Sequence, residues 1–335
     1  MTLSRIATHP LSLMITAVTL WMLYPPLVNG LIDTLGAFYV AAVAHTLAAV
    51  SMAVFAWFLV IAPSRRSATP VLSADHLARL SLPTLMSGVL ISANHLLLYF
   101  ALQASTQFDV LAILVFEAWP LLFFYFDSAL RRESKSTTWK DFALVGAAFA
   151  GFLLLTASNY RPMEDGALSG SALMVMGLAG LGGLAMALNC YFRLRCMDTW
   201  QAISAEKGLD LDGFKLGVLT EAGVRSVAAP LLIGAFLLFG NTPLEMPMAS
   251  LVLIGFVGFA ILGMGSLLYD LAIYRANNAA IGALWYFMPI GAVLTLAVIE
   301  GRPLTLYEIA ASTLIVGSNL LLGLRSAPSP EQATS

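Results

Sequence analysis

Ten apolar segments, each about long enough to cross a lipid bilayer, account for nearly all of this chain. A hydrocarbon core of about 30 Å requires about 20 apolar residues in an α-helix. Only 11% of the residues are charged, whereas about a quarter of the residues in a soluble domain are charged. The sequence therefore predicts an all-α polytopic membrane protein with ten transmembrane helices. The predicted spans are Leu11–Gly30, Thr34–Ile61, Leu80–Leu102, Gln107–Asp127, Phe142–Ser158, Ser169–Phe192, Leu216–Phe239, Ser250–Tyr274, Ala279–Ile299 and Thr305–Leu324.

The basic residues separate between the two sides of the membrane that these spans define. Of the 17 basic residues, the opposite side from the N-terminus holds only Arg161 and Arg302, and Arg225 lies within a span. Because cytoplasmic loops carry the excess of Lys and Arg, we expect both termini in the cytoplasm, with residues 1–10 as an N-terminal tail and 325–335 as a disordered tail. The basic residues on the N-terminal side are Arg5, Arg65, Arg66, Arg79, Arg131, Arg132, Lys135, Lys140, Arg193, Arg195, Lys207, Lys215, Arg275 and Arg325.

The chain also resembles itself at a fixed offset. When the sequence is shifted by 170 positions, Gly88 meets Gly258, and the Leu-Leu-Tyr stretch that ends at Tyr99 meets the one that ends at Tyr269. Leucine matches are common between membrane helices, so these matches count mainly because they fall where a duplication would place them. They predict an internal repeat.

The repeat unit is a half of five spans, residues 11–160 and 165–324. After one gap, Pro120 in the fourth span meets Pro289 in the ninth. Because five is an odd number, the second half must cross the membrane in the opposite direction to the first. Inverted repeats are typical of secondary transporters, whose substrate site lies near the middle of the membrane.

Short motifs lie at equivalent places in the two halves. A Glu-Gly-Arg-Pro-Leu-Thr turn from Glu300 to Thr305 precedes the tenth span, and Glu133 is a looser counterpart before the fifth. With the mid-span prolines, these features resemble the EamA-type drug/metabolite transporter (DMT) superfamily. The Tyr99-x-x-Leu102-Gln103 and Glu117–Ala118–Trp119–Pro120 stretches are similar to the YddG-type aromatic amino acid exporters of that superfamily.

The resemblance implies a basket of ten helices in which spans one to four and six to nine surround a central cavity. It implies a small organic substrate moved by alternating access, and a multi-pass protein of the bacterial inner membrane. We expect it to need no cofactor or metal and to work as a monomer, because one chain with both halves can close its own cavity.

Glu117 is the first candidate for the substrate site. It lies about ten residues into its predicted span, or about 15 Å at 1.5 Å per residue, which is the bilayer centre. An ionisable group there is costly and normally faces the interior of the bundle. Glu117 therefore binds a substrate ammonium or a proton, or else it is a neutral carboxyl that serves packing. In a continuous helix Trp119 lies about 200° around from Glu117, so we place it against a neighbouring helix or the lipid.

The repeat suggests partners for Glu117. Glu117 maps to Tyr286 and Phe116 maps to Trp285. We expect these aromatic side chains to form the opposite wall of the cavity, although a Trp–Tyr pair can equally serve packing. Replacing Phe116 or Tyr286 by alanine should then change substrate preference more than replacing Trp119.

The third span offers a second polar face. His95 and Tyr99 are spaced i and i+4, and Asn94 adds an amide beside them. Tyr269 is the counterpart of Tyr99 in the eighth span. These side chains are candidate substrate ligands, and the alternative for His95 is a hydrogen-bonded histidine of the helix interior.

Breaks in the helices point to hinges. Paired Gly or Pro interruptions at corresponding places in two halves mark the site or hinge of a transporter, although glycine also serves close packing. We expect the first and sixth spans to bend at such residues. The predicted hinge residues are Pro25, Pro26, Gly182, Gly183, Pro120 and Pro289.

Glu221 and Arg225 in the seventh span are spaced i and i+4, which suits a structural ion pair. The sequence contains no Walker A lysine motif, no His-Glu-x-x-His and no clustered basic patch, so we expect neither an enzyme nor a nucleic-acid partner. Two classes remain. One is an exporter of amino acids, with efflux of lipophilic cations as its near alternative; the other is a non-transporting membrane enzyme or scaffold.

Overall fold

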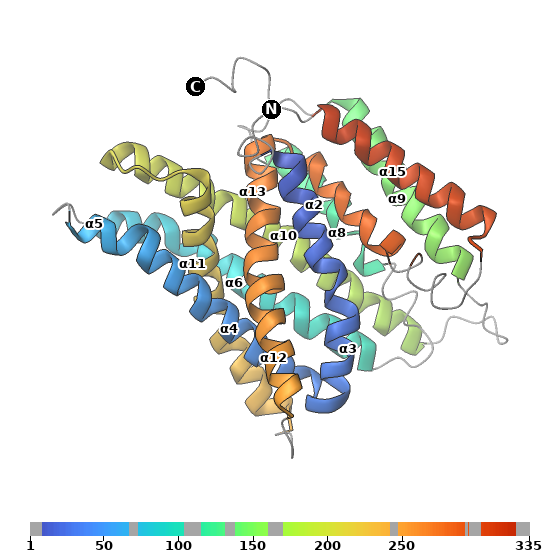
Figure 1. Cartoon of the computed structure of the whole chain (residues 1–335), viewed down its shortest axis with the longest axis horizontal. Helices are drawn as coiled ribbons and strands as arrows, with labels where there is room; N and C mark the ends of the chain where they lie inside the picture. Colours follow the sequence, from blue (N-terminus) through green and yellow to red (C-terminus); the bar gives the residue numbers. More distant parts are fainter. Residues whose placement is uncertain are drawn as a thin grey trace. The chain divides into compact units, whose positions relative to one another are not determined.

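The computed structural model describes residues 9–66, 73–103, 115–130, 138–159, 170–241, 247–291, 294 and 303–325. This part of the chain forms helices joined by turns and contains no strand (Figure 1). Within it, six helices are long and apolar enough to cross a membrane, and three shorter apolar helices accompany them. The prediction of a multi-pass helical membrane protein is confirmed at this level. Residues 1–8 and 326–335 of the predicted tails, Glu133 and Glu300 lie outside the described residues.

Three helices depart from α geometry: η1 and η2 are π-helices and η3 is a 3₁₀-helix. In chain order the described helices are α2 (Pro10–Met22), α3 (Tyr24–Leu35), α4 (Ala37–Ala56), η1 (Trp57–Ile61), α5 (Ala62–Arg66), α6 (Ala74–Gln103), α8 (Trp119–Leu130), α9 (Trp139–Asn159), α10 (Gly170–Lys207), α11 (Gly213–Phe239), α12 (Met248–Phe256), η2 (Val257–Gly265), α13 (Ser266–Ala276), η3 (Ala279–Tyr286) and α15 (Leu306–Arg325).

The helix of the sixth span is longer than the sequence suggested. Helix α10 continues to Lys207, so Arg193 lies inside a helix and not in a loop after it. Arg193 is buried and forms an ion pair with Asp270. A charged residue can continue a membrane helix when a buried partner compensates it, and hydropathy alone does not reveal such a partner.

The described helices belong to two compact units. Unit 1 comprises Met1–Met22, Asn94–Ala187 and Arg275–Ser335, and unit 2 comprises Leu23–Ala93 and Leu188–Tyr274. Each unit takes segments from both predicted halves of the chain. The units therefore do not coincide with residues 11–160 and 165–324.

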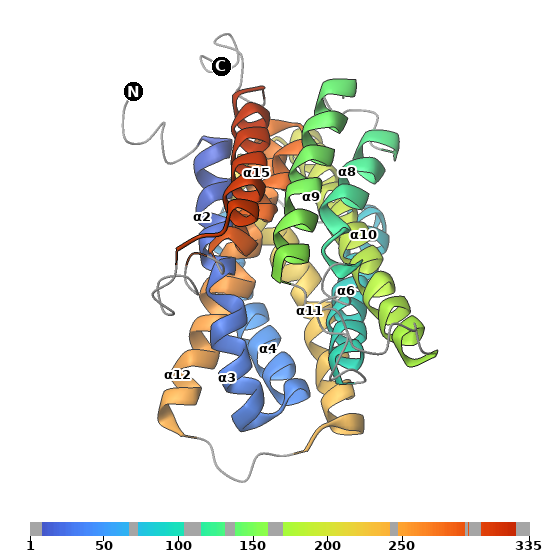
Figure 2. The same cartoon turned by 90° about the vertical axis from the view of Figure 1, so that its right-hand side faces the viewer.

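In unit 1, α9 and α15 lie side by side along their length (Figures 1 and 2). Both helices begin with the same type of cap. The Thr138 amide donates to Asp141 Oδ2 at 2.8 Å, and the Thr305 amide donates to Glu308 Oε2 at 2.7 Å. Such caps satisfy amide groups that have no partner within the helix. Helix η3 packs against α2, α8, α9 and α15 in the same unit.

In unit 2, α4 packs along α11 and against η2. Two glycines permit the close approach of helices here. A Cβ on Gly258 would lie 2.6 Å from the Ala44 carbonyl oxygen and 2.8 Å from Leu47 Cβ, and a Cβ on Gly88 would lie 2.4 Å from Val227 Cβ. None of these distances leaves room for a methyl group, so both positions require glycine.

We expect Gly258→Ala to destabilise the protein by about 1–3 kcal/mol, the usual cost of overpacking. The added methyl group would press on the backbone of α4, which cannot move away as a flexible side chain could. Gly255→Ala is a matched control, because a Cβ there has no atom within 4 Å. Thermal unfolding in detergent should separate the two variants, and equal midpoints would contradict the packing described here.

Candidate functional site

The chain around Glu117 is not a continuous helix. Val115 and Phe116 are helical, Glu117 and Ala118 form a turn, and α8 begins at Trp119. Pro120 is thus the second residue of α8, where its missing N–H costs little. It cannot donate to the Phe116 carbonyl four residues earlier, which explains why the helix is interrupted there. The sequence predicted Pro120 in the middle of a helix, and the structure places it at the start of one.

Glu117 contacts the two aromatic residues that the repeat paired with it. The Trp285 indole Nε1–H donates to Glu117 Oε2 at 2.8 Å, and the Tyr286 hydroxyl donates to the Glu117 carbonyl oxygen at 3.2 Å. All three residues belong to unit 1. Tyr286 is fully buried and stacks on Phe152, with ring centroids 5.6 Å apart. The structure thus brings Glu117, Trp285 and Tyr286 into direct contact, rather than onto facing walls.

Trp285 and Tyr286 are held by an unusual segment. They end η3, a 3₁₀-helix of eight residues, all of them buried; 3₁₀-helices seldom exceed three or four residues. The Asn278 side chain caps its start by accepting from the Ala280 amide at 2.9 Å. Pro289 follows in the next turn and lacks the amide that α-helical bonding to Trp285 would need. Proline chemistry therefore accounts for the irregular backbone on both sides of the Glu117 contact.

Trp119 also belongs to this site, where it packs against a neighbouring segment, one of the two placements that the sequence predicted. Its side chain is fully buried, and its ring lies at 74° to that of Trp285 with centroids 5.0 Å apart. It interacts with the Glu117 carboxylate as well. Trp21 adds a third indole, 5.4 Å from Trp285. The sequence analysis did not place Trp119 beside Glu117, because it extended one helical phase across Glu117–Ala118, where the backbone turns.

Trp285→Phe tests the bond to Glu117. Phenylalanine keeps an aromatic ring in place but removes the only donor that Trp285 offers. A hydrogen bond to a charged group is worth about 1.5–3 kcal/mol, so we expect the variant to be destabilised by about this amount. Thermal unfolding in detergent would measure this, with Tyr125→Phe as a control, because Tyr125 is exposed on α8. An unchanged midpoint for Trp285→Phe would show that the bond does not stabilise this site.

Asn94 and the two glycines of α10 make a tight helix contact. The Asn94 Nδ2–H donates to the Gly182 carbonyl oxygen at 3.1 Å. A Cβ on Gly183 would lie 2.6 Å from the Phe116 carbonyl oxygen. Helix α10 is continuous through both glycines. Because these glycines have no side chain, they admit a neighbouring backbone here.

The remaining predicted ligands divide between the units. His95 and Tyr99 lie in unit 1, where their rings meet nearly edge to face at a centroid distance of 6.2 Å. Both are buried. Tyr269 is buried in unit 2. The first span does break as expected, since α2 ends at Met22 and α3 begins at Tyr24, with Pro25 and Pro26 in its first turn.

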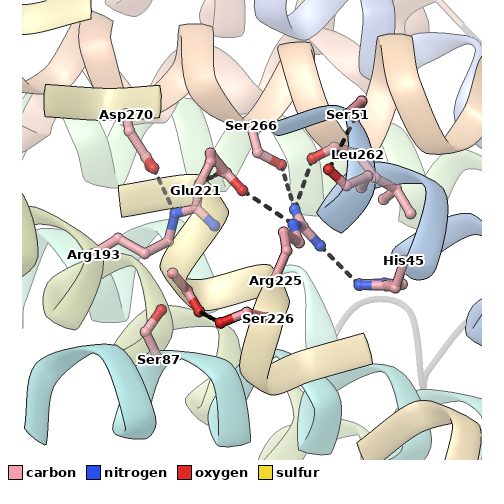
Figure 3. Close-up of polar contacts among 12 residues, drawn as sticks. His45, Ser51, Ser87, Arg193, Glu221, Arg225, Ser226, Leu262, Ser266 and Asp270 are labelled. Atoms are coloured by element: carbon pink, nitrogen blue, oxygen red, sulfur yellow. Dashed lines mark hydrogen bonds and ion pairs between the residues drawn. The ribbon is translucent and has the colours of Figure 1, made fainter. Parts of the chain in front are cut away.

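The Glu221–Arg225 ion pair is present in unit 2, with Arg225 Nε donating to Glu221 Oε2 at 3.0 Å. It is part of a larger group of buried charges that also includes Arg193 and Asp270 (Figure 3). The sequence analysis missed Arg193 because its position suggested a loop. Among the described residues, no group of three or more His, Cys, Asp or Glu could hold a metal ion.

No family model matches the chain, and no curated protein matches it. Fifteen chains of solved structure do match. One of them, described only as "Crystal structure of protein", superposes with a TM-score of 0.65. The match covers 94% of this chain and 96% of that chain, at 17% sequence identity. The two chains therefore share a fold over nearly their whole lengths, and at this identity the likeness extends to the fold alone.

Proposed function

We propose that this chain is a secondary transporter of the DMT type, built as two inverted five-helix repeats, that exports amino acids across a bacterial inner membrane. Aromatic and other large neutral amino acids are the favoured substrates. The observation that carries the proposal is the Glu117 carboxylate, which lies in the turn before α8 and has the indoles of Trp285 and Trp119 beside it. Charged side chains at such helix breaks mark substrate sites in transporters.

Contacts within unit 2 support the inverted repeat. Gly88 approaches the Val224 carbonyl oxygen and the Val227 Cβ, and Gly258 approaches the Ala44 carbonyl oxygen and the Leu47 Cβ. Ala44 and Val224 are 180 positions apart, as are Leu47 and Val227. The two glycines, already paired by the sequence, therefore make the same contact with equivalent residues.

Two further contacts join equivalent residues to each other. At the same offset of 180 positions His45 corresponds to Arg225, and these side chains lie 2.8 Å apart. In unit 1, Glu117 and its counterpart Tyr286 are hydrogen-bonded. In a two-fold arrangement, equivalent residues meet only close to the axis. Both pairs are therefore expected of an inverted repeat, and both involve candidate functional residues.

The connections between the units support the hinge assignments. The chain passes between them after Met22, Ala93, Ala187 and Tyr274, which lie in the first, third, sixth and eighth spans. These spans form two repeat-equivalent pairs. The Pro25–Pro26 and Gly182–Gly183 pairs each fall within about a turn of a crossing. A change of angle at these places is the motion that alternating access requires.

The roles follow from the chemistry of the groups. In this proposal the Glu117 carboxylate binds the substrate ammonium, and the indoles contact an aromatic side chain of the substrate. Indoles also favour cations. The carboxylate of the substrate is assigned to the amide groups at the start of α8. We do not assign the substrate carboxylate to Asn94, because the Asn94 side-chain amide donates to the Gly182 carbonyl oxygen. Phe116, His95, Tyr99 and Tyr269 remain candidate lining residues.

Efflux of lipophilic cations is the alternative, because a carboxylate among indoles also suits a substrate that has no carboxylate of its own. Counterflow of radiolabelled phenylalanine into proteoliposomes of the purified protein tests the two. Unlabelled amino acids and methyl viologen serve as competitors, and empty liposomes as the control. Accumulation that amino acids abolish supports the proposal. Flux of a labelled cation without phenylalanine flux would establish the alternative, and no flux of either substrate would contradict transport of both classes.

A further inference from the structure

Unit 2 contains five polar side chains that are linked in a chain and removed from solvent. Arg193 joins Asp270 and Glu221, and Arg225 joins Glu221 and His45 (Figure 3). The exposed fraction of each is 3% or less. They come from α10, α13, α11 and α4, all within helices apolar and long enough to cross a membrane. Two arginines face two carboxylates, so the group is neutral as a whole when both carboxylates are ionised.

Arg225 and Glu221 form the fixed part of this group. Beyond Glu221, Arg225 donates to the Leu262 carbonyl oxygen at 2.7 Å and to the Ser266 hydroxyl at 3.0 Å. His45 Nδ1 lies 2.8 Å from Arg225 and must act as the acceptor, because a guanidinium can only donate. A proton on Glu221 would leave Arg225 without a carboxylate partner, which is costly inside a membrane.

Asp270 differs from Glu221 in its connections. It accepts from Arg193 Nε at 2.5 Å, and Arg193 also pairs with Glu221. A proton on Asp270 therefore removes one ion pair and leaves each arginine paired with Glu221. The bond between Arg193 and Asp270 joins α10 to α13. The chain enters unit 2 within α10, after Ala187, and leaves it within α13, after Tyr274. Asp270 is thus the carboxylate whose ionisation can change at least cost, and its bond lies beside two connections between the units.

We propose that Asp270 is the proton-binding site through which a proton gradient drives export. The proposal rests on the transport function above. A proton that enters from outside bonds to an Asp270 carboxylate oxygen, and the bond to Arg193 is lost. Release of the proton to the cytoplasm restores that bond, so one proton moves inward as substrate moves outward.

The groups that face Asp270 agree with this assignment. On α10 these are Arg193 and the thiols of Cys190 and Cys196. On α11 they are Arg225, and Glu221 through Arg193. His45 of α4 lies beyond Arg225. His45 is not the proton site, because a second positive charge would stand 2.8 Å from Arg225.

Two transport assays on the same proteoliposomes separate this proposal from the proposed function. Counterflow of labelled phenylalanine at equal pH requires only a carrier. Net uptake driven by an acidic interior requires coupling as well. Asp270→Asn mimics the protonated side chain, and Tyr274→Phe is a control on the same helix that removes the hydroxyl bonded to Gln201 at 2.6 Å.

We expect the acidic interior to accelerate uptake by the wild-type protein and by Tyr274→Phe. Asp270→Asn should retain counterflow within about twofold and lose at least about 90% of the acceleration. Wild-type counterflow without acceleration by the acidic interior would overturn the Asp270 proposal but not the transport function. The Asp270 proposal would also be overturned by an Asp270→Asn variant that keeps the acceleration or loses counterflow. No wild-type counterflow would overturn the transport function and this proposal together. If Asp270→Asn does not fold, the double variant Asp270→Asn/Arg193→Gln keeps the group neutral and carries the same expectations.

Proton release by the purified protein gives a second readout. Phenylalanine added to the wild-type protein in weak buffer should displace the proton and acidify the solution. Asp270→Asn should release none, whereas equal release from both proteins would overturn the assignment.

Discussion

Replacing Glu117 by glutamine should slow phenylalanine counterflow about tenfold or more and leave the protein folded. Glutamine has nearly the same shape and can still accept from the Trp285 indole, which donates to Glu117 at 2.8 Å. What it lacks is the negative charge that would hold an ammonium group. A hydrogen bond to a charged partner contributes about 1.5–3 kcal/mol, and 1.4 kcal/mol corresponds to a factor of ten in binding. Initial rates in proteoliposomes measure the effect.

Glu308→Gln is the matched control for this substitution. Glu308 is buried in the same unit, and its carboxylate caps α15 by accepting from the Thr305 amide. A glutamine side-chain oxygen can make the same cap, so this variant should transport at the wild-type rate. If Glu117→Gln also transports every substrate at the wild-type rate, Glu117 has no part in binding.

The second large effect concerns stability. Glu221→Gln should destabilise the protein by about 3–5 kcal/mol, the usual result of removing one member of a buried ion pair. Glu221 is fully buried and is shared by Arg193 and Arg225. Its loss leaves Arg225 with His45, Ser266 and a carbonyl oxygen but no opposite charge. Thermal unfolding in detergent should show a clearly lower midpoint.

The control for this prediction is Glu206→Gln. Glu206 also pairs with an arginine, Arg79, at 2.7 Å, but both side chains are exposed. Exposed ion pairs contribute little, so the midpoint should hardly change. Similar midpoints for Glu206→Gln and Glu221→Gln would mean that the buried charges do not stabilise unit 2.

The sequence carried the class of fold and the centre of the candidate site for separate reasons. Hydropathy over about 20 residues is a strong signal, which is why the multi-pass helical character could be predicted. The prolines at 120 and 289 align the two halves and so paired Glu117 with Tyr286, although the sequence analysis placed the two on opposite walls and the structure brings them into contact. The hydropathy signal is averaged over many residues, and the repeat signal rests on prolines, whose backbone is rigid.

Local backbone irregularity could not be predicted. The turn at Glu117–Ala118 brings Trp119 beside Glu117, and η3 replaces the expected α-helix before Pro289. The burial of Arg193 could not be predicted for a related reason, since a charge near the end of an apolar run suggests a loop unless its partner is known. That partner, Asp270, lies 77 positions away in the chain. Such contacts depend on tertiary packing, which a single sequence does not display.

Labelling of Glu117 by dicyclohexylcarbodiimide, followed by mass spectrometry of the peptide, tests the central claim most directly. This reagent modifies carboxyl groups in apolar surroundings, and Glu117 lies among indoles. If Glu117 binds the substrate ammonium, phenylalanine should protect it from modification in a concentration-dependent way and should leave Glu308 unaffected. Modification of Glu117 to the same extent with and without phenylalanine, in a preparation that transports phenylalanine, would contradict the account.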